Sequence, residues 1–293
     1  MKILLLGKNG QLGWELQRAL SPLGEVTALD RHNGGDLSDE QAMLAAVRDA
    51  APDVIVNAAA YTAVDKAESD GPAALQINAT APGLLAQEAA RLGALLVHYS
   101  TDYVFDGSGD QARTEDAPTA PLSVYGSTKL AGEDAIRASG CVHLILRTSW
   151  VFAARGGNFA KTMLRLAAER DQLKVIADQI GAPTGADLLA DLSAHMIVAT
   201  RSRPEIGGTY HAAASGETSW HAYARHVIEF ARARGTAVKV APEQILPIPT
   251  TEYPTPARRP LNSRLDTAKL ARNFGLRLPP WQQGVDRMLN EIL

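Results

Sequence analysis

An apolar strand followed by a glycine-rich turn and a helix opens this chain. Ile3–Leu6 is a continuous apolar run, which is typical of a strand buried on both faces of a parallel sheet. Gly7, Gly10 and Gly13 follow at three-residue spacing, and the apolar residues of Trp14–Leu20 then recur with helical spacing. Glycines in this context permit a tight turn and let the backbone approach a pyrophosphate at the helix N-terminus. The opening therefore predicts a dinucleotide-binding unit, although a strand–helix turn without a ligand has the same pattern.

The alternation of strands and helices continues through the first half of the chain. Four further apolar runs of strand length are separated by helical segments, and they are Val26–Leu29, Val54–Asn57, Ala94–Tyr99 and Val142–Arg147. Repeated alternation predicts parallel strands joined by right-handed crossovers. We therefore expect an α/β fold in which a doubly wound parallel sheet of the Rossmann type carries a smaller α+β lobe.

Two domains are expected, because 293 residues suit one large or two modest domains. We place a dinucleotide-binding domain at residues 1–148 and most of a substrate-binding lobe at residues 149–293. Segments near 178–210 and 240–250 are expected to return to the first domain.

Asp30 closes the second predicted strand, about 20 residues past the glycine turn, where an acidic side chain binds the adenosine ribose diol. Its negative charge favours NADH, whereas Arg31 and His32 directly after it are suited to accept the 2′-phosphate of NADPH. The sequence therefore leaves the choice between NADH and NADPH open. Asp36 and Leu37 are candidates for contacting the adenine, and capping of the next helix by Asp36 or Ser38 is an equally good interpretation.

Small residues follow the third predicted strand. Ala58, Ala59 and Ala60 let the backbone lie flat against a ligand at the carboxyl end of a strand, and Tyr61 and Thr62 come next. Alanine-rich packing without a ligand explains the composition equally well.

Tyr125 and Lys129 are separated by one helical turn if the segment from Pro121 to Ala138 is helical. An ammonium beside a phenol lowers the tyrosine pKa from its ordinary value of roughly 10, and such a tyrosine exchanges a proton with a carbonyl or alcohol oxygen. Tyr-x-x-x-Lys also recurs by chance on many helices. The significance of the motif depends on whether the rest of the chain builds a site for a redox cofactor. The strand Ala94–Tyr99 delivers Ser100 and Thr101 to the edge of the sheet where such a cofactor is expected.

Several strings in the same order resemble the extended short-chain dehydrogenases/reductases that act on nucleotide sugars. Over nearly the whole length, the resemblance is to the dTDP-4-dehydrorhamnose reductase family. The strings that carry it are Gly7–Glu15, Asn57–Glu68, Tyr99–Phe105, Arg147–Trp150, Asp178–Gly185 and Pro254–Pro260.

The resemblance implies reduction of the C4 ketone of dTDP-4-dehydro-L-rhamnose to dTDP-L-rhamnose by NADH or NADPH. In the implied triad, Tyr125 donates the proton, Thr101 hydrogen-bonds the same oxygen, and Lys129 lowers the tyrosine pKa and holds the nicotinamide ribose. The implied cofactor contacts are Gly7, Gly10, Gln11, Leu12, Gly13, Asp30, Asp36, Leu37, Ala60, Tyr61, Thr62, Tyr99, Tyr125 and Lys129. The implied substrate contacts are Thr101, Asp102, Tyr103, Trp150 and Arg258, although core packing is an alternative for Trp150 and solvation for Arg258.

Related enzymes and a non-enzyme remain alternatives. Nucleotide-sugar dehydratases of this group carry Thr-Asp-Glu where this chain has Thr101, Asp102 and Tyr103, so dehydration is disfavoured. An epimerase uses the same Tyr and Lys, so the sequence separates it less cleanly from a reductase. The regulatory subunit of methionine adenosyltransferase resembles the family and acts as a binding partner, but the complete triad favours an enzyme.

The resemblance also implies a homodimer, with a magnesium ion at the dimer contact held by Glu15, Asp187 and Glu291. Asp187 is one methylene shorter than the glutamate that the family favours there. The net charge of −3 gives no reason to expect nucleic acid, and no apolar run is long enough for a signal peptide or a membrane span. A cytoplasmic enzyme is therefore expected, with its product used in cell-surface polysaccharide such as the O-antigen of lipopolysaccharide.

Overall fold

A six-stranded parallel sheet forms the centre of the structure, a computed structural model that describes residues 1–293. Its strand order is β10-β5-β4-β3-β1-β2, and every neighbouring pair is parallel. The strands are β1 (Lys2–Leu6), β2 (Glu25–Leu29), β3 (Val54–Asn57), β4 (Leu95–Thr101), β5 (His143–Thr148) and β10 (Gly208–His211). The predicted doubly wound sheet is therefore confirmed.

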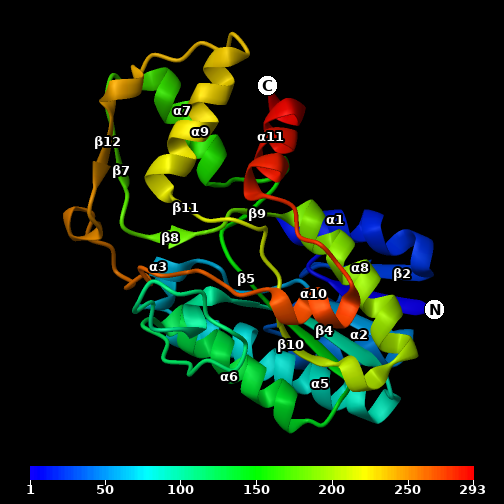
Figure 1. Ribbon diagram of the computed structural model, residues 1–293. Coiled ribbons are helices and arrows are strands. Elements are labelled where there is room, and N and C mark those ends of the chain that lie inside the picture. The colour runs from blue at the N-terminus through cyan, green and yellow to red at the C-terminus, as the bar shows by residue number, and fades with distance from the viewer.

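Helices cover both faces of the sheet, as Figure 1 shows. On one face lie α1 (Gln11–Leu20) and α8 (Ala186–Ser202), which pack apolar side chains against β1, β3, β4 and β5. On the other face lie α2 (Glu40–Ala50), α5 (Ala81–Leu92) and α6 (Val124–Ala138). Burial on both faces explains why the strands have continuous apolar runs instead of alternating ones.

The helical segment before β4 contains a π-helical turn, Gln76–Thr80, between α4 (Gly71–Leu75) and α5. The Asn78 amide in this turn accepts from the backbone N–H of Tyr61 and donates to the Tyr61 carbonyl and to Thr128 Oγ1. The turn thereby links the segment after β3, including α3 (Val64–Ala67), to α6.

The second half builds a lobe above the sheet in Figure 1. It contains α7 (Phe159–Glu169), α9 (Trp220–Ala233), α11 (Trp281–Ile292) and a parallel pair, β7 (Leu173–Ile176) with β12 (Ile245–Ile248). Short pairs join this lobe to the sheet region: β6 (Val151–Phe152) with β9 (Thr184–Gly185), and β8 (Ile180–Gly181) with β11 (Thr218–Ser219). A short helix, α10 (Ala268–Phe274), packs near β10.

The expectation that residues 240–250 return to the main sheet is wrong. The strand in this segment, β12, pairs with β7, and Ile245 is buried in a cluster with α7 and α9. A short apolar strand fits the pattern of either sheet, so its partner depends on the packing of the lobe. Within the segment near 178–210, α8 covers the sheet and β10 extends it.

The division of the chain into two domains at residue 148 stays a prediction.

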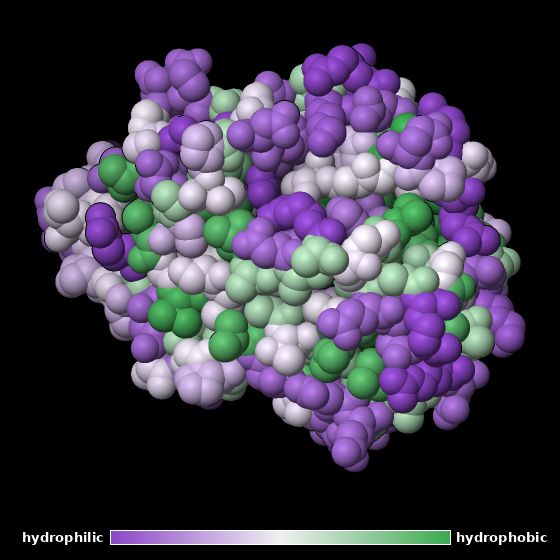
Figure 2. Space-filling view, turned by 90° about the horizontal axis from the view of Figure 1, so that it is seen from below, coloured by the Kyte–Doolittle hydropathy of each residue, from purple (hydrophilic) through white to green (hydrophobic).

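The outer surface mixes polar and apolar residues. Figure 2 shows the face seen from below, where hydrophilic side chains are spread between smaller apolar patches. None of the helices combines the length and the apolar character needed to span a bilayer.

Candidate active site

The carboxyl ends of the central strands open into a cleft of about 990 Å³. It lies where the strand order reverses, because β1 has β2 on one side and β3 on the other. Open α/β sheets bind ligands at this topological position. Most of the predicted site residues line the cleft: Gly7, Gly10, Gln11, Leu12, Asp30, Asp36, Leu37, Ala60, Thr62, Tyr99, Thr101, Asp102, Tyr103, Tyr125, Lys129 and Trp150.

The glycine turn is shaped for a close approach of backbone to ligand. Gly7 has a φ of +88°, and a Cβ on it would lie 2.7 Å from the backbone nitrogen of Ala59, so only glycine fits. Gly10 precedes α1 and provides no side-chain cap, so the first N–H groups of the helix stay available to an anion. Gly13 does not line the cleft; it lets α1 pack against the backbone of Gly7.

Asp30 at the end of β2 is held by its own neighbours. Its carboxylate accepts from Asn9 Nδ2 at 2.6 Å and from the backbone N–H of His32 at 2.8 Å, and Lys8 Nζ lies 3.6 Å away. The His32 hydrogen bond contributes most to lowering the pKa of Asp30, and Lys8 lowers it further. Asp30 is thus a fixed anion, with Arg31 and His32 beside it at the same end of the cleft.

Two expectations around the cofactor segments need correction. Asp36 and Ser38 hydrogen-bond each other and do not cap α2, because the carboxylate of Asp39 accepts from the N–H of Ala42 and caps that helix. Tyr61 does not line the cleft, because its hydroxyl donates to Asp70.

Tyr125, Lys129 and Thr101 all line the cleft. Ser123 caps α6 by accepting from the N–H of Gly126, which starts the helix so that Tyr125 and Lys129 share one face. Thr101 is the last residue of β4, and its hydroxyl donates to Asp102 Oδ1 at 3.0 Å while accepting from the N–H of Tyr103 at 3.2 Å.

The protonation states differ from the expectation that Lys129 lowers the pKa of Tyr125. Burial raises the pKa of Tyr125 to about 12, with a smaller opposing effect of the neighbouring Thr101 hydroxyl. Burial lowers the pKa of Lys129 to about 8, although the charge of Glu133 opposes this shift. Lys129 Nζ lies 3.1 Å from His98 Nε2. At neutral pH, Tyr125 is therefore protonated and equipped to donate a proton.

Asp102 is a further buried acid in the cleft. Burial raises its pKa to about 6, although hydrogen bonds from Ser263 and Thr101 oppose this shift. Its Oδ2 has no hydrogen-bond partner, so this oxygen remains able to accept from a bound ligand.

A buried ion pair anchors α6 to the sheet. Arg147 on β5 donates to Glu133 with both Nε and Nη2, at 2.9 and 2.7 Å. The two side chains are 3% and 0% exposed. Because Glu133 lies one turn beyond Lys129 on α6, this pair helps to set where the helix that carries Tyr125 and Lys129 lies.

The far end of the cleft is formed by two stacked tryptophans. The rings of Trp150 and Trp220 are 3.7 Å apart at an interplanar angle of 16°, and Trp220 Nε1 donates to Gln179 Oε1 at 3.1 Å. Trp150 has a φ of +49°, an uncommon backbone conformation that marks a constrained position. Sequence reasoning missed Trp220, because a single tryptophan at a helix start carries no signal that separates a cleft from a core.

The adjacent Arg258 and Arg259 have different surroundings. Arg259 binds both carboxylate oxygens of Asp65, at 3.0 and 2.8 Å. Arg258 is exposed and does not line the cleft. The structure therefore does not bring Arg258 together with the other predicted substrate contacts.

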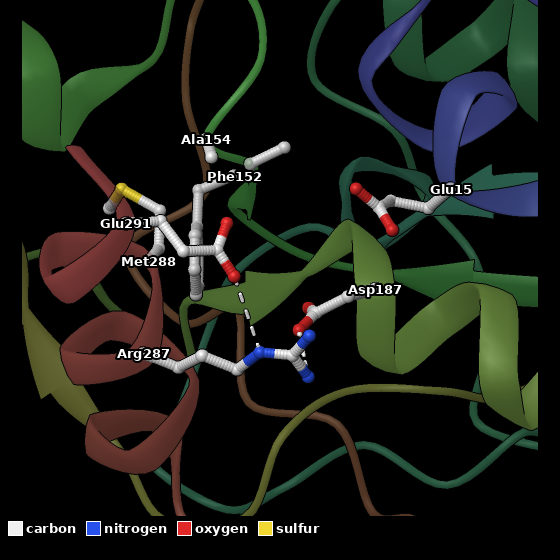
Figure 3. A pocket seen from close by; sticks show the side chains of 8 residues that line it. Glu15, Phe152, Ala154, Asp187, Arg287, Met288 and Glu291 are labelled. Atoms are coloured by element: carbon white, nitrogen blue, oxygen red, sulfur yellow. Dashed lines mark ion pairs between the residues drawn. The ribbon is translucent and has the colours of Figure 1, made fainter. Parts of the chain in front are cut away.

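Glu15, Asp187 and Glu291 line one small pocket outside the cleft, and Arg287 lies among them (Figure 3). The Arg287 guanidinium is 3.2 Å from Asp187 and 3.4 Å from Glu291. No group of three or more His, Cys, Asp or Glu side chains is arranged to hold a metal ion. The expected magnesium site does not fit within one chain, because Arg287 supplies the positive charge that a cation would bring.

The fold and the site together define a short-chain dehydrogenase/reductase of the extended type: a doubly wound sheet, a glycine turn at its switch point, and Tyr125, Lys129 and Thr101 at the cleft. The family model described as RmlD substrate binding domain matches residues 1–293, and the chain belongs to this family.

Named relatives and solved structures agree with this assignment. A dTDP-4-dehydrorhamnose reductase of Shigella flexneri is 57% identical, with 100% of this chain and 98% of that protein covered. A solved dTDP-4-dehydrorhamnose reductase of Clostridium acetobutylicum has a TM-score of 0.89 at 36% identity, covering 100% of this chain and 99% of that one. The Bacillus anthracis reductase solved in complex with NADP also has a TM-score of 0.89, at 34% identity and with 99% and 100% covered.

Proposed function

We propose that this protein reduces the C4 ketone of dTDP-4-dehydro-L-rhamnose to dTDP-L-rhamnose with a nicotinamide cofactor. The observation that carries the proposal is the meeting of Tyr125, Lys129 and Thr101 in one cleft with the glycine turn. Relatives that bear this reductase name and match over the full length support the choice of substrate.

The cleft suits NADH or NADPH. The crowded turn at Gly7 and the uncapped start of α1 suit a pyrophosphate, and Asp30 lies where the adenosine ribose is bound. Asp30 is already engaged by Asn9 and Lys8, and Arg31 lies beside it, so a 2′-phosphate is not excluded by charge. The relative solved with NADP supports use of NADPH.

The chain's own residues handle the proton of the reaction. A bound reduced nicotinamide supplies the hydride to C4. Tyr125, protonated at neutral pH because burial raises its pKa, donates a proton to the ketone oxygen as negative charge develops there. Thr101 lines the same cleft, and its hydroxyl would turn its proton from Asp102 Oδ1 to this oxygen when the substrate binds.

The residues after Thr101 favour simple reduction. Dehydration requires an additional acid and base, and Asp102 is the one carboxyl group in the Thr101–Tyr103 stretch. Tyr103 packs edge-on against Tyr125, with ring centroids 5.6 Å apart, which helps to exclude water from the tyrosine. We therefore favour a reductase over a dehydratase.

A homodimer, a cytoplasmic location and use of the product in cell-surface polysaccharide belong to the same proposal. A metal held by Glu15, Asp187 and Glu291 would compete with Arg287 for Asp187 and Glu291. Sedimentation with and without a chelator tests this point: a dimer that persists in the chelator needs no magnesium.

The test of function is oxidation of NADH and NADPH by the purified protein with enzymatically generated dTDP-4-keto-L-rhamnose. Absorbance at the nicotinamide band follows the reaction, and NMR of the sugar identifies the product. We expect cofactor oxidation that depends on the keto sugar and yields dTDP-L-rhamnose. Folded protein that binds cofactor but does not turn over this sugar would favour an epimerase or a binding subunit.

A further inference from the structure

The buried neighbours of Lys129 form a chain of hydrogen bonds that reaches the end of β3. Lys129 Nζ lies 3.1 Å from His98 Nε2, and His98 Nδ1 lies 3.2 Å from Asn57 Nδ2. Asn57 Oδ1 accepts from the backbone N–H of Ala59 at 3.2 Å. Asn57, His98 and Lys129 are each no more than 2% exposed, so these partners matter more than solvent.

The direction of each hydrogen bond in this chain follows from its fixed end. The backbone N–H of Ala59 can only donate, so the oxygen of the Asn57 amide faces Ala59 and the nitrogen faces His98. An amide nitrogen donates and does not accept, so His98 Nδ1 accepts and carries no proton. The proton of the neutral imidazole is then on Nε2, which faces Lys129.

This tautomer determines which protonation state Lys129 can adopt. An ammonium group has donors only, as has an Nε2–H group, so two donors would face each other at 3.1 Å. The contact is a hydrogen bond if Lys129 is a neutral amine whose lone pair accepts from His98.

Two effects favour the neutral amine of Lys129. Burial lowers its pKa only to about 8, against the charge of Glu133, and the Nε2–H group that faces the amine disfavours the ammonium further. Glu133, one turn away on α6, is engaged by Arg147 and Arg137 and lies beyond ion-pair distance of Lys129. Tyr125 on the preceding turn is neutral, since its pKa is raised to about 12, and His98 is neutral because burial lowers its pKa. An isolated buried ammonium is costly without a paired anion.

We propose that His98, oriented by Asn57, is a positioning residue that holds Lys129 as a neutral amine in the cofactor-free protein. Its use rests on the proposed function: ribose hydroxyls of a bound cofactor offer acceptors that His98 does not, so Lys129 turns from His98 to these hydroxyls and takes up a proton from solvent when the cofactor binds. The positive charge beside Tyr125 is then present only in the complex that reacts.

The direct test is the tautomer of His98 in the full-length protein labelled with ¹⁵N-histidine. Ring nitrogen shifts distinguish Nε2–H from Nδ1–H, and His98→Gln identifies the signal among the seven histidines. We expect Nε2–H in the unliganded protein. Nδ1–H there would overturn the proposal, whatever the protein's activity.

Asn57→Asp provides the matched variant, because it replaces one amide nitrogen by oxygen without adding atoms. The new carboxylate accepts from His98 Nδ1–H, which turns the imidazole around and lets Nε2 accept from an ammonium. We expect the Nδ1–H tautomer in this variant. We also expect the basic limb of its pH profile, where kcat/KM falls at alkaline pH, to move to higher pH by about one unit or more. A merely structural role would lower stability and leave this limb in place.

The two hypotheses fail separately. Absence of turnover with the keto sugar overturns the proposed function, while the tautomer still decides the role of His98. Turnover by a protein whose Asn57→Asp variant keeps the wild-type tautomer and basic limb would support the function and overturn this inference.

Discussion

Replacing Glu133 by glutamine tests how α6, the helix that carries Tyr125 and Lys129, is anchored. The native carboxylate receives two hydrogen bonds from Arg147 and one from Arg137, and it is fully buried. Burial by itself would raise the pKa of Glu133, but the hydrogen bonds and charge of Arg147 outweigh it and lower the pKa. Glu133→Gln keeps the shape of the side chain and leaves the Arg147 guanidinium buried without its counterion.

The expected cost is large because the pair is buried. Breaking a buried ion pair from one side costs about 3–5 kcal/mol of unfolding free energy. The matched control is Glu169→Gln, which breaks the exposed pair with Arg165 on α7, where the two side chains are 60% and 54% exposed. An exposed pair of this kind contributes about 0.5 kcal/mol or less.

Urea unfolding of both variants at pH 7 measures the difference. A carboxyl pKa that is lowered by folding stabilises the protein above its unfolded pKa, and the effect is lost as pH falls through the folded value. The gap between Glu133→Gln and wild type should therefore shrink below about pH 4. If Glu133→Gln costs no more than the surface control, the pair does not anchor α6 and the reasoning is wrong. The double variant Glu133→Leu with Arg147→Met should regain much of the loss, because it removes both charges together.

Three further substitutions probe the cleft. Asp102→Asn should stabilise the protein at pH 7 by on the order of 2–3 kcal/mol, because folding raises the Asp102 pKa from 3.8 to about 6. The gain should vanish toward pH 4, and equal stability of both proteins in urea unfolding at pH 7 would contradict the prediction. Asp30→Asn should raise the ratio of kcat/KM with NADPH to that with NADH, and Arg31→Ala should lower it; unchanged ratios would remove both residues from cofactor choice. Gly7→Ala should lower the free energy of unfolding by more than about 1 kcal/mol and weaken cofactor binding, because the φ of Gly7 is +88° and the new Cβ meets Ala59. Thermal melting measures the stability and fluorescence titration with NADPH the binding, and normal binding would refute the tight turn.

Local patterns in the sequence were sufficient for the sheet and for the centre of the site. Continuous apolar runs indicate strands buried on both faces, and the carboxyl ends of parallel strands meet at one edge. Gly7, Asp30 and Thr101 each follow such a run, so their meeting in one cleft was predictable. The helix carrying Tyr125 and Lys129 was considered between Pro121 and Ala138, and the structure has it at Val124–Ala138 with Ser123 as its cap.

What the sequence did not predict depends on packing between distant segments. Arg287 pairs with Asp187 across about a hundred residues of chain, and Trp220 stacks on Trp150 from another helix. The strand at Ile245–Ile248 has the right pattern for either sheet and joins β7. His98 did leave a signal, as a polar residue within an otherwise apolar strand, but its meaning depends on Asn57 and Lys129 beside it.

The measurement that tests the account most directly compares wild type with Tyr125→Phe in single-turnover reduction of dTDP-4-keto-L-rhamnose by NADPH. The two proteins differ by one hydroxyl group, and cofactor binding measured in parallel shows whether the cleft is intact. We expect the reduction rate to fall by about a hundred-fold or more with cofactor affinity retained, the usual scale for a positioned acid. Reduction by Tyr125→Phe at the wild-type rate would contradict the assignment of Tyr125 as the proton donor.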